Sequence, residues 1–396
     1  MSRSIPALVE PSVLRWARET VDLSPLAAAR KIKVPDDRVD AWEAGTAQPT
    51  VAQLRTAAKV YKRSLGVFFL PEPPQGYDTL RDFRRVEGAE EAAWSPALHG
   101  DYRRAHVQRE HLIELADLED VEHPTHWRID PLPTSDELIA AAARERLCSL
   151  MPLPLPRNGA KYGHLNAWIA ALEMAGVLVM ASSGGLVPIS EMRGFSLFFD
   201  QVPVIMVNGA DTPRGRLFTL LHEYAHLLLH TEGLCDTLTD TRAVSPNRRL
   251  EARCNAIAAA ILMPATAVTA RFSALRPVSE DGWDYDTLAN AAKPFGTSAE
   301  SFLRRLVTLG HVDAGLYRRR RAEFIARYDE DEKRTRAAGG DWYRNTVRDL
   351  GKGYVRAVAD AHRRRSIDSC TAATYLNVKV DQIPRLAQKA SLAEAV

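Results

Sequence analysis

The sequence has few cysteines and no long apolar run. Its four cysteines are scattered and show none of the paired spacings of a disulfide scaffold: Cys148, Cys235, Cys254 and Cys370. No apolar stretch is long enough to span a bilayer, and Glu10 and Arg15 interrupt the N-terminus where a signal peptide would carry its apolar core. We therefore predict a cytoplasmic protein with no membrane partner.

The sequence also has little net charge. Its 52 Lys and Arg residues and 50 Asp and Glu residues give a formal charge of +2 at pH 7. Any nucleic-acid surface must therefore be local, and the basic runs Arg318–Arg321 and Arg363–Arg365 are interpreted as solvated helix faces that can touch phosphates. The 46% hydrophobic and 26% charged content is that of a globular protein, and 396 residues predict two or three domains.

Short helices dominate the first 66 residues. Ser24 is a favourable N-cap and Pro25 a favourable first helical residue, which predicts a helix from about Pro25 to Ile32. The acids that follow Pro35 favour the start of a third helix, which turns Trp42 inward. Four or five short helices in this order fit a helix-turn-helix module.

A three-part pattern resembles the Xre-type helix-turn-helix family over residues 11–66: Ser24, Trp42-Glu43-Ala44-Gly45 and Pro49. The resemblance implies possible contacts with DNA, for which Arg30, Lys31 and Arg38 are the candidates. Phosphates would repel the carboxylates of Asp36 and Asp37 at the start of the predicted recognition helix. A partner protein is therefore the alternative ligand of this module.

The motif His222-Glu223-Tyr224-Ala225-His226 is the strongest chemical signal in the chain. Histidines four residues apart lie on one face of a helix, so both imidazoles can bind one zinc ion at about 2.0–2.1 Å. Glu223 follows the first histidine and can take a proton from zinc-bound water. We therefore predict zinc-dependent hydrolysis on a buried helix, with Glu223 as the catalytic base.

A catalytic zinc ion needs a third protein ligand and an open fourth position. The next predicted helix starts at Ser245-Pro246 and carries Glu251 in its first turns. Because this helix is otherwise apolar, Glu251 is the favoured ligand. Asp236 and Asp240 are the alternatives, and His230 is not favoured.

Several motifs together resemble the ImmA/IrrE metallopeptidase family over residues 160–310: Arg193-Gly194-Phe195-Ser196, Phe218-Thr219-Leu220, Leu227-Leu228-Leu229, Glu251 with Asn255, and Leu262-Met263-Pro264. The resemblance implies that His222, His226 and Glu251 bind one catalytic Zn2+ and that Glu223 is the general base. It also implies an endopeptidase of the gluzincin kind that cleaves repressors or antitoxins, often of Xre type.

Cys254 departs from the family pattern, which has a small residue such as alanine at this position. Three residues after Glu251, its thiolate can face the metal and occupy the fourth position, which is the hypothesis of a thiol switch. The alternative is a small buried apolar side chain. Unchanged activity of Cys254→Ala under both oxidising and reducing conditions would exclude the switch.

Arg193 and Asn208 lie on strands that the sequence predicts before the metal helix. An edge strand there can align a peptide, and a cation can stabilise an oxyanion. Arg193, Asn208 and Asn255 are therefore candidates for substrate binding or for support of the ligands. A simple ion pair of Arg193 with Glu191 is the alternative.

These predictions combine into a mainly helical α+β protein. We expect a helix-turn-helix domain in residues 1–70, a linker and helical connector in 71–150, a zinc peptidase domain with a small antiparallel sheet in 151–275, and a C-terminal helical region in 276–396. Within the last region, Leu288–Leu309 predicts a helix pair with its turn at Phe295–Ser298.

The predicted function is a zinc endopeptidase that cleaves a repressor or antitoxin protein and so controls transcription in a stress, phage or toxin–antitoxin context. The alternative is a DNA-binding transcriptional regulator whose zinc site is structural or sensory. Glu223→Gln separates the two, because it keeps the three ligands and removes only the base.

Overall fold

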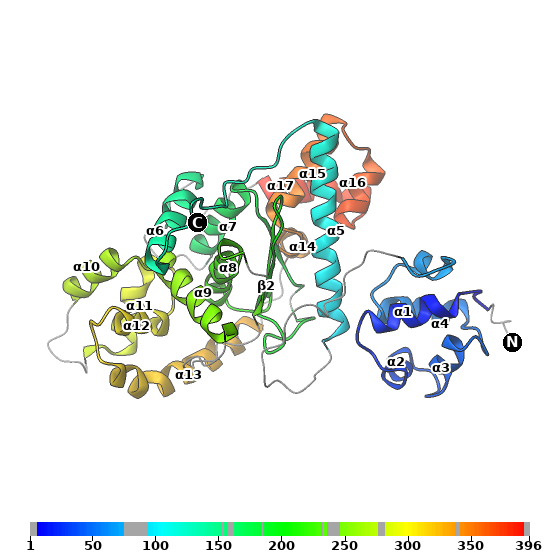
Figure 1. Cartoon of the computed structure of the whole chain (residues 1–396), viewed down its shortest axis with the longest axis horizontal. Coiled ribbons are helices and arrows are strands. Elements are labelled where there is room, and N and C mark those ends of the chain that lie inside the picture. Colours follow the sequence, from blue (N-terminus) through cyan, green and yellow to red (C-terminus); the bar gives the residue numbers. More distant parts are fainter. Residues whose placement is uncertain are drawn as a thin grey trace. The chain divides into compact units, whose positions relative to one another are not determined.

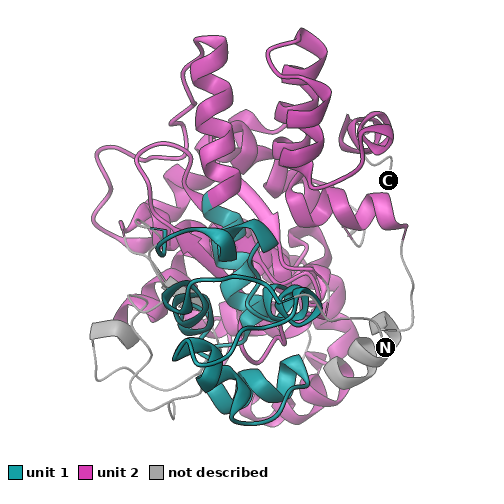
Figure 2. Ribbon diagram, turned by 90° about the vertical axis from the view of Figure 1, so that its right-hand side faces the viewer, with its two compact units in different colours: residues 1–106 teal, residues 107–396 magenta. Residues whose placement is uncertain are grey.

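The structure is a computed structural model of the full chain and describes residues 6–74, 94–152, 154–156, 162–183, 185–230, 233–235, 246–275, 282–336 and 341–391. The chain forms two compact units, residues 1–106 and 107–396 (Figure 2). It is mainly helical with one small sheet, which confirms the predicted α+β class. Within these ranges no single helix has the length and apolarity of a membrane span; the bent pair Arg249–Leu262 and Ala265–Leu275 passes by length and composition only.

The small unit begins with a series of short helices: α1 (Pro11–Glu19), α2 (Pro25–Ile32), α3 (Arg38–Glu43), α4 (Val51–Val60) and the 3₁₀ helix η1 (Leu65–Phe69). Helix α2 has the predicted bounds, and the Ser24 hydroxyl accepts a hydrogen bond from the amide of Ala27 at 3.2 Å. Thr50 and Gln53 form a reciprocal capping box at the start of α4. Side-chain caps therefore define the starts of α2 and α4.

A buried ion pair joins α1 to α3 in the small unit. Arg18 donates from Nε and Nη2 to the two carboxylate oxygens of Glu43, at 2.7 and 2.8 Å. Both side chains are buried beside Trp42, which is 2% exposed. Because the two charges satisfy each other inside the core, Glu43 of the Trp-Glu pattern has a structural role. The Xre-type assignment of this unit stays a prediction.

The large unit contains most of the helices and all strands of the sheet. In chain order these are α5 (Pro96–Glu119, which begins in the small unit), α6 (Asp136–Leu150), α7 (Gly163–Met174), β1 (Leu178–Ala181), β2 (Gly194–Leu197), β3 (Val204–Val207), α8 (Pro213–Leu228), β4 (Gly233–Cys235), α9 (Pro246–Leu262), α10 (Ala265–Leu275), α11 (Tyr285–Ala292), η4 (Lys293–Phe295), α12 (Ala299–Thr308), α13 (Ala314–Arg336), α14 (Trp342–Leu350), α15 (Lys352–Arg364), α16 (Ser369–Leu376), η5 (Val380–Gln382) and α17 (Ile383–Ser391).

The sheet has the strand order β1-β3-β2-β4. Strand β1 runs parallel to β3, whereas β2 is antiparallel to both β3 and β4. The predicted antiparallel sheet is therefore wrong in one respect, because the sheet is mixed. The reason is that β1 pairs with β3 and not with β2, its neighbour in sequence. Because β2 and β3 run in opposite directions, β1 can be parallel to β3 while β2 is antiparallel to it. Helix α8 lies against β2 and β3 and brings the metal motif to the sheet (Figure 1).

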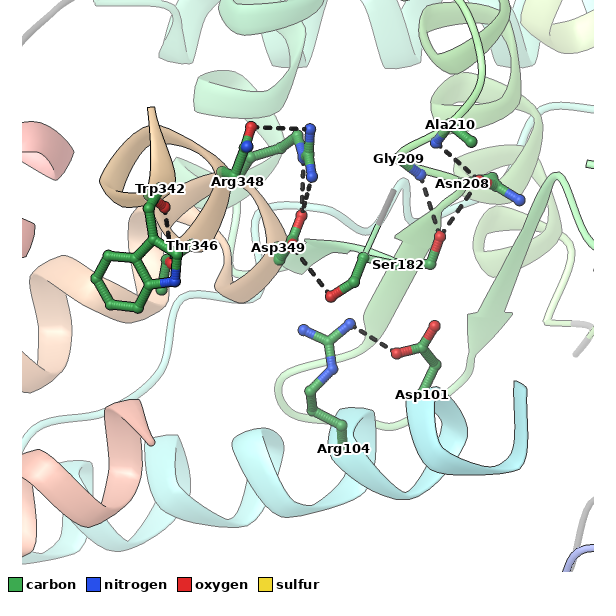
Figure 3. Close-up of polar contacts among 12 residues, drawn as sticks. Asp101, Arg104, Ser182, Asn208, Gly209, Ala210, Trp342, Thr346, Arg348 and Asp349 are labelled. Carbon is green, nitrogen blue, oxygen red and sulfur yellow. Dashed lines mark hydrogen bonds and ion pairs between the residues drawn. The ribbon is translucent and has the colours of Figure 1, made fainter. Parts of the chain in front are cut away.

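The C-terminal helices α14 and α15 pack against β1. Gly351, between them, has a φ of +92°, and a Cβ at this position would lie 2.2 Å from the carbonyl oxygen of Val179. Only glycine therefore permits this close approach. Asp349, which Figure 3 labels, also accepts a hydrogen bond at 3.0 Å from Ser183, in the loop that follows β1.

A buried carboxylate anchors α15 to α7. Glu173 accepts hydrogen bonds from the amide of Gly353 at 2.7 Å and from Nη2 of Arg356 at 2.9 Å. Its side chain is 7% exposed. Burial raises the pKa of Glu173, while the charge of Arg356 and the amide of Gly353 oppose this rise. The C-terminal helices are thus fixed to the large unit by a polar contact as well as by apolar packing.

Arg356→Met leaves the Glu173 carboxylate with one of its two partners. We expect the free energy of unfolding to fall by about 1–3 kcal/mol, since a buried charge that loses its partner is costly. The deficit should shrink at acidic pH, where the carboxyl is protonated. Urea denaturation measures the loss. The control Arg363→Met removes an exposed pair with Asp360 and should cost less than about 0.5 kcal/mol. Equal small effects would contradict the anchoring role.

Candidate metal centre

Helix α8 passes through the core of the large unit. The hydroxyl of Thr212 accepts a hydrogen bond from the amide of Gly215 at 3.1 Å, and Pro213 is the first helical residue. Every residue from Thr219 to Leu228 is buried. The polar residues of the zinc motif are therefore held inside the protein, between the sheet and α9.

Three donor groups converge between α8 and α9. The Nε2 atoms of His222 and His226 are 3.1 Å apart, and the two carboxylate oxygens of Glu251 lie 3.1 and 3.3 Å from these nitrogens. Ligand atoms of all three residues lie within 4.8 Å of one another. The other carboxylates that the sequence offers as third ligand, Asp236 and Asp240, lie outside the described residues.

The donor set fits a catalytic zinc ion. Such an ion takes three protein ligands from histidine nitrogens and a carboxylate, and keeps a fourth position open. The side chains of His222 and His226 are only 2% and 1% exposed, whereas that of Glu251 is 37% exposed. The cluster therefore has a buried side on α8 and a side on α9 that solvent reaches.

Hydrogen bonds couple the protonation of the candidate ligands. Burial disfavours the charged imidazole of His226, but hydrogen bonds with Cys254 and Glu251 outweigh it and raise the pKa of His226 to about 11. Burial opposes ionisation of Glu251, yet its contacts with His222 and His226 lower its pKa to about 2. Metal ligation requires a neutral imidazole, so zinc binding must displace the proton of His226.

Asn255 orients the first histidine. It lies one turn after Glu251 on α9, and its Oδ1 is 2.9 Å from Nδ1 of His222. Because an amide oxygen only accepts hydrogen bonds, Nδ1 carries the hydrogen and the Nε2 lone pair is left for a metal. Asn255 therefore supports a ligand.

Glu223 lies fully buried beside the candidate ligands. The hydroxyl of Ser196 on β2 donates to its Oε2 at 2.9 Å. Within the described part of the chain, Oε1 has no hydrogen-bond partner. Burial raises the pKa of Glu223, and the charges of His226 and His222 only partly oppose the rise. A carboxylate with a raised pKa and an unused oxygen is suited to accept a proton.

Ser196 and Gly194 belong to the site, although their motif alone predicts no role for either residue. A Cβ at Gly194 would lie 2.4 Å from Cγ2 of Thr219 and 3.3 Å from Cγ of Glu223, so β2 passes close to α8. The two residues are spaced by two and therefore lie on the same face of the strand. This spacing is a signal in the sequence, but it does not reveal which face meets α8.

Asn208 and Arg193 hold loops beside the site. Asn208 is fully buried; its Nδ2 donates to the carbonyls of Val187 and Met192 at 3.1 and 2.7 Å, and its Oδ1 accepts from the amide of Ala210 at 2.9 Å (Figure 3). Nη1 of Arg193 pairs with Asp211 at 3.3 Å. The structure therefore brings neither side chain into the ligand cluster, in contrast to Asn255.

Cys254 is buried, and its thiol makes a hydrogen bond with the ring of His226. Burial raises the pKa of the Cys254 thiol, although the contact with His226 opposes the rise. Without a metal ion the neutral thiol is thus favoured, and its buried contact with His226 is that of a small core side chain. This favours the small buried side chain, and the thiol switch stays a prediction.

The remaining candidates are not among the three residues whose donor atoms converge. His230 follows α8 and is exposed, with its ring 4.8 Å from that of Phe198. Arg30, Lys31 and Arg38 are exposed on the small unit. Of these, Arg30 has its Nε atom 3.9 Å from Asp36.

Gly194→Ala tests the close contact between β2 and α8. The new methyl group would overlap Thr219 and the carbonyl of Met206, so we expect a loss of about 1–3 kcal/mol in stability together with weaker zinc binding. Thermal unfolding and zinc titration measure the two effects. Gly66→Ala is the matched control, because no atom lies within 4 Å of its added Cβ. Similar behaviour of the two variants would contradict the close contact.

Asn255→Ala tests the orientation of His222. Removal of this partner should weaken zinc binding by about 10–100-fold, since the imidazole loses the hydrogen bond that fixes its ring. Competition with a chelating dye measures the affinity. Asn345→Ala is the control; it removes a contact with Arg348 on α14 and should leave zinc affinity unchanged. Wild-type affinity of Asn255→Ala would show that His222 needs no such support.

Comparison with known families bears on this part of the chain. Residues 172–307 match the family model described as IrrE N-terminal-like domain (Peptidase_M78). No curated protein matches the chain. The matched range runs from within α7 to within α12 and contains the candidate ligands and Glu223. Residues 172–307 are therefore similar to the IrrE N-terminal-like domain of the Peptidase_M78 family.

Proposed function

We propose that this protein is a zinc-dependent endopeptidase that cleaves a repressor or antitoxin protein and so controls transcription. The observation that carries the proposal is the convergence of His222, His226 and Glu251 beside the buried carboxylate of Glu223. The peptidase family of residues 172–307 supports it. In this proposal the three converging residues hold one Zn2+, and Glu223 is the general base.

Zinc in this position would supply Lewis acidity to the scissile carbonyl and to the attacking water. The chain itself moves the proton. Glu223 takes the proton of the water on Oε1, because Oε2 is engaged by Ser196. The same carboxyl then returns the proton to the amine leaving group. Burial assists the first transfer, since it favours the neutral form of the carboxyl.

We assign the small unit to recognition of the protein substrate. Its resemblance to Xre-type modules supports this role, since the repressors that the related peptidases cleave are often of the same type. Asp36 and Asp37, which precede α3, and Asp40 within it are exposed, and phosphates would repel them. DNA binding through Arg30, Lys31 and Arg38 is therefore the weaker assignment for this unit.

A second candidate function is a transcriptional regulator whose zinc site is structural or sensory. Such a site needs only His222, His226 and Glu251. A buried carboxylate with one unpaired oxygen costs free energy, and sites that only hold a metal do not require it. The position of Glu223 therefore favours the peptidase.

Glu223→Gln keeps the shape of the side chain and removes its ability to accept a proton. We expect this variant to hold one zinc ion per chain and to cleave a co-expressed repressor, encoded beside its gene, at least about 100-fold more slowly than the wild type. Intact mass spectrometry measures cleavage, and elemental analysis measures zinc. The control Glu110→Gln changes an exposed glutamate that pairs with Arg109 and should retain wild-type cleavage.

The two functions give opposite results in this experiment. If wild type and Glu223→Gln cleave the repressor alike, Glu223 is not the base. If neither protein cleaves and both regulate transcription equally, the zinc site is structural or sensory.

A further inference from the structure

The last helices of the chain, α15, α16 and α17, lie together in the large unit (Figure 1). Helix α16 begins at the N-cap Asp368, whose carboxylate accepts a hydrogen bond from the amide of Thr371 at 2.7 Å. It ends at Asn377, which adopts the left-handed conformation with a φ of 51°. Asparagine tolerates this conformation, so the chain turns sharply and re-enters helix through η5 and α17.

The same spacing occurs in α2 and α3 of the small unit. In both pairs the first helix has eight residues and lies between an N-cap and a left-handed residue. In each pair, the sixth and ninth residues after the left-handed residue are buried and belong to the second helix. The N-cap, the left-handed residue and the two buried residues are, in that order, Ser24, Lys33, Val39 and Trp42 in one pair, and Asp368, Asn377, Ile383 and Leu386 in the other. The α16–α17 pair thus repeats the spacing that predicts a helix-turn-helix in the small unit.

We propose that α16 and α17 form a second helix-turn-helix, and that α17 binds the major groove of double-stranded DNA. In this motif the N-terminal part of the second helix meets the base edges. In α17 and the turn before it, the residues that would face the DNA in this way are all exposed: Lys379, Val380, Asp381, Pro384, Arg385 and Gln388. Lysine and arginine can contact phosphate or guanine, glutamine can contact adenine, and valine can contact a thymine methyl group.

Helix α16 packs against α5, whereas one face of α17 is exposed to solvent. The hydroxyl of Tyr375 on α16 donates to Glu114 of α5 at 2.6 Å, and its ring stacks on His111 at 3.8 Å. On α17, Ile383 and Leu386 are buried. The guanidinium of Arg385 lies 4.2 Å from the ring centre of Tyr343 on α14. Stacking of this kind fixes an arginine while leaving its in-plane donors available.

The basic residues of this region include two on the proposed DNA-facing surface. Residues 352–391 contain eight Lys and Arg residues and three Asp residues, and three of the cations, Arg356, Arg364 and Lys389, pair with acids outside this range. Lys379 and Arg385 are both exposed. The contribution of basic residues to DNA affinity comes from phosphates and is independent of sequence. Positive charge on this surface alone can therefore contribute to DNA affinity, although the chain as a whole is nearly neutral.

Two other helix pairs do not offer such a face. In the α2–α3 pair the equivalent outer positions include Asp36, Asp37 and Asp40, which are exposed and negative. In α12, which follows the left-handed Gly296, all the equivalent positions are buried or half-buried. Tyr317 of α13 lies over that helix, where it contacts two side chains: it donates to Glu300 at 2.8 Å and stacks with Arg304 at 5.3 Å. Among the three pairs, α16–α17 alone combines exposure with positive charge.

The experiment uses the full-length protein and a pool of DNA duplexes with a randomised centre. The wild type should enrich a preferred sequence, whose affinity fluorescence anisotropy then gives over a series of salt concentrations. Lys379→Ala/Arg385→Ala should weaken binding of the selected duplex at least about tenfold and reduce the slope of log affinity against log salt by about 2. The matched control Lys31→Ala/Arg38→Ala removes two positive charges from the small unit and should leave affinity and slope unchanged.

Four results would overturn the proposal: no duplex is enriched; both double variants lose affinity equally; only the control loses affinity; or the α17 variant loses binding to the protein substrate while its DNA affinity is unchanged. Equal loss in both double variants would show that DNA affinity follows the total charge of the protein. Loss of substrate binding alone would show that the surface of α17 binds a protein. None of these measurements depends on peptidase activity, so the inference and the proposed function can fail separately.

Asp381→Asn provides a test that does not rely on loss of function. The substitution removes a carboxylate from the proposed DNA-facing surface and should strengthen binding of the selected duplex, because repulsion of the phosphates is relieved. Circular dichroism checks that the variant folds like the wild type. Unchanged or weaker binding by a folded Asp381→Asn would contradict the placement of α17 on DNA.

Discussion

Burial of α8 is the constraint on which the rest of the large unit depends. Its buried stretch from Thr219 to Leu228 includes His222, Glu223 and His226, and ionisable groups in a core are costly unless they are partnered. Two neighbouring elements supply such partners. Strand β2 provides Ser196, and α9 provides its carboxylate and amide side chains. Contacts with the buried polar side chains of α8 therefore help to fix the positions of the sheet and of α9.

The sequence predicts the parts of the site whose geometry is local. Histidines four residues apart share a helix face whatever the fold, and the role of Glu251 needs only that the next helix packs along the first. Ser196 is different, because its bond to Glu223 depends on the alignment of β2 with α8. The structural role of Asn208 cannot be predicted from the sequence either, because it depends on how the loop between β1 and β2 packs against this side chain. The parallel pairing of β1 also follows from tertiary arrangement.

The C-terminal helix pair shows the same limit. The bounds of α2 follow from Ser24 and Pro25, and α16 has an equally good N-cap in Asp368. Its turn, however, uses Asn377 where glycine is the usual signal. The basic run before it is interpreted as a solvated face, and Arg364 indeed pairs with Glu119 at 3.0 Å. Only the backbone conformation and the buried residues of α17 reveal the repeated spacing.

Anomalous diffraction at the zinc edge, from crystals of the zinc-loaded protein, would locate the metal ion and its ligands. We expect a single zinc ion bound to Nε2 of His222, Nε2 of His226 and the carboxylate of Glu251, with Glu223 off the metal and a non-protein ligand in the fourth position. A zinc ion with four protein ligands would contradict the account, because a closed coordination sphere leaves no place for water or substrate. Zinc bound elsewhere in the chain would contradict it equally.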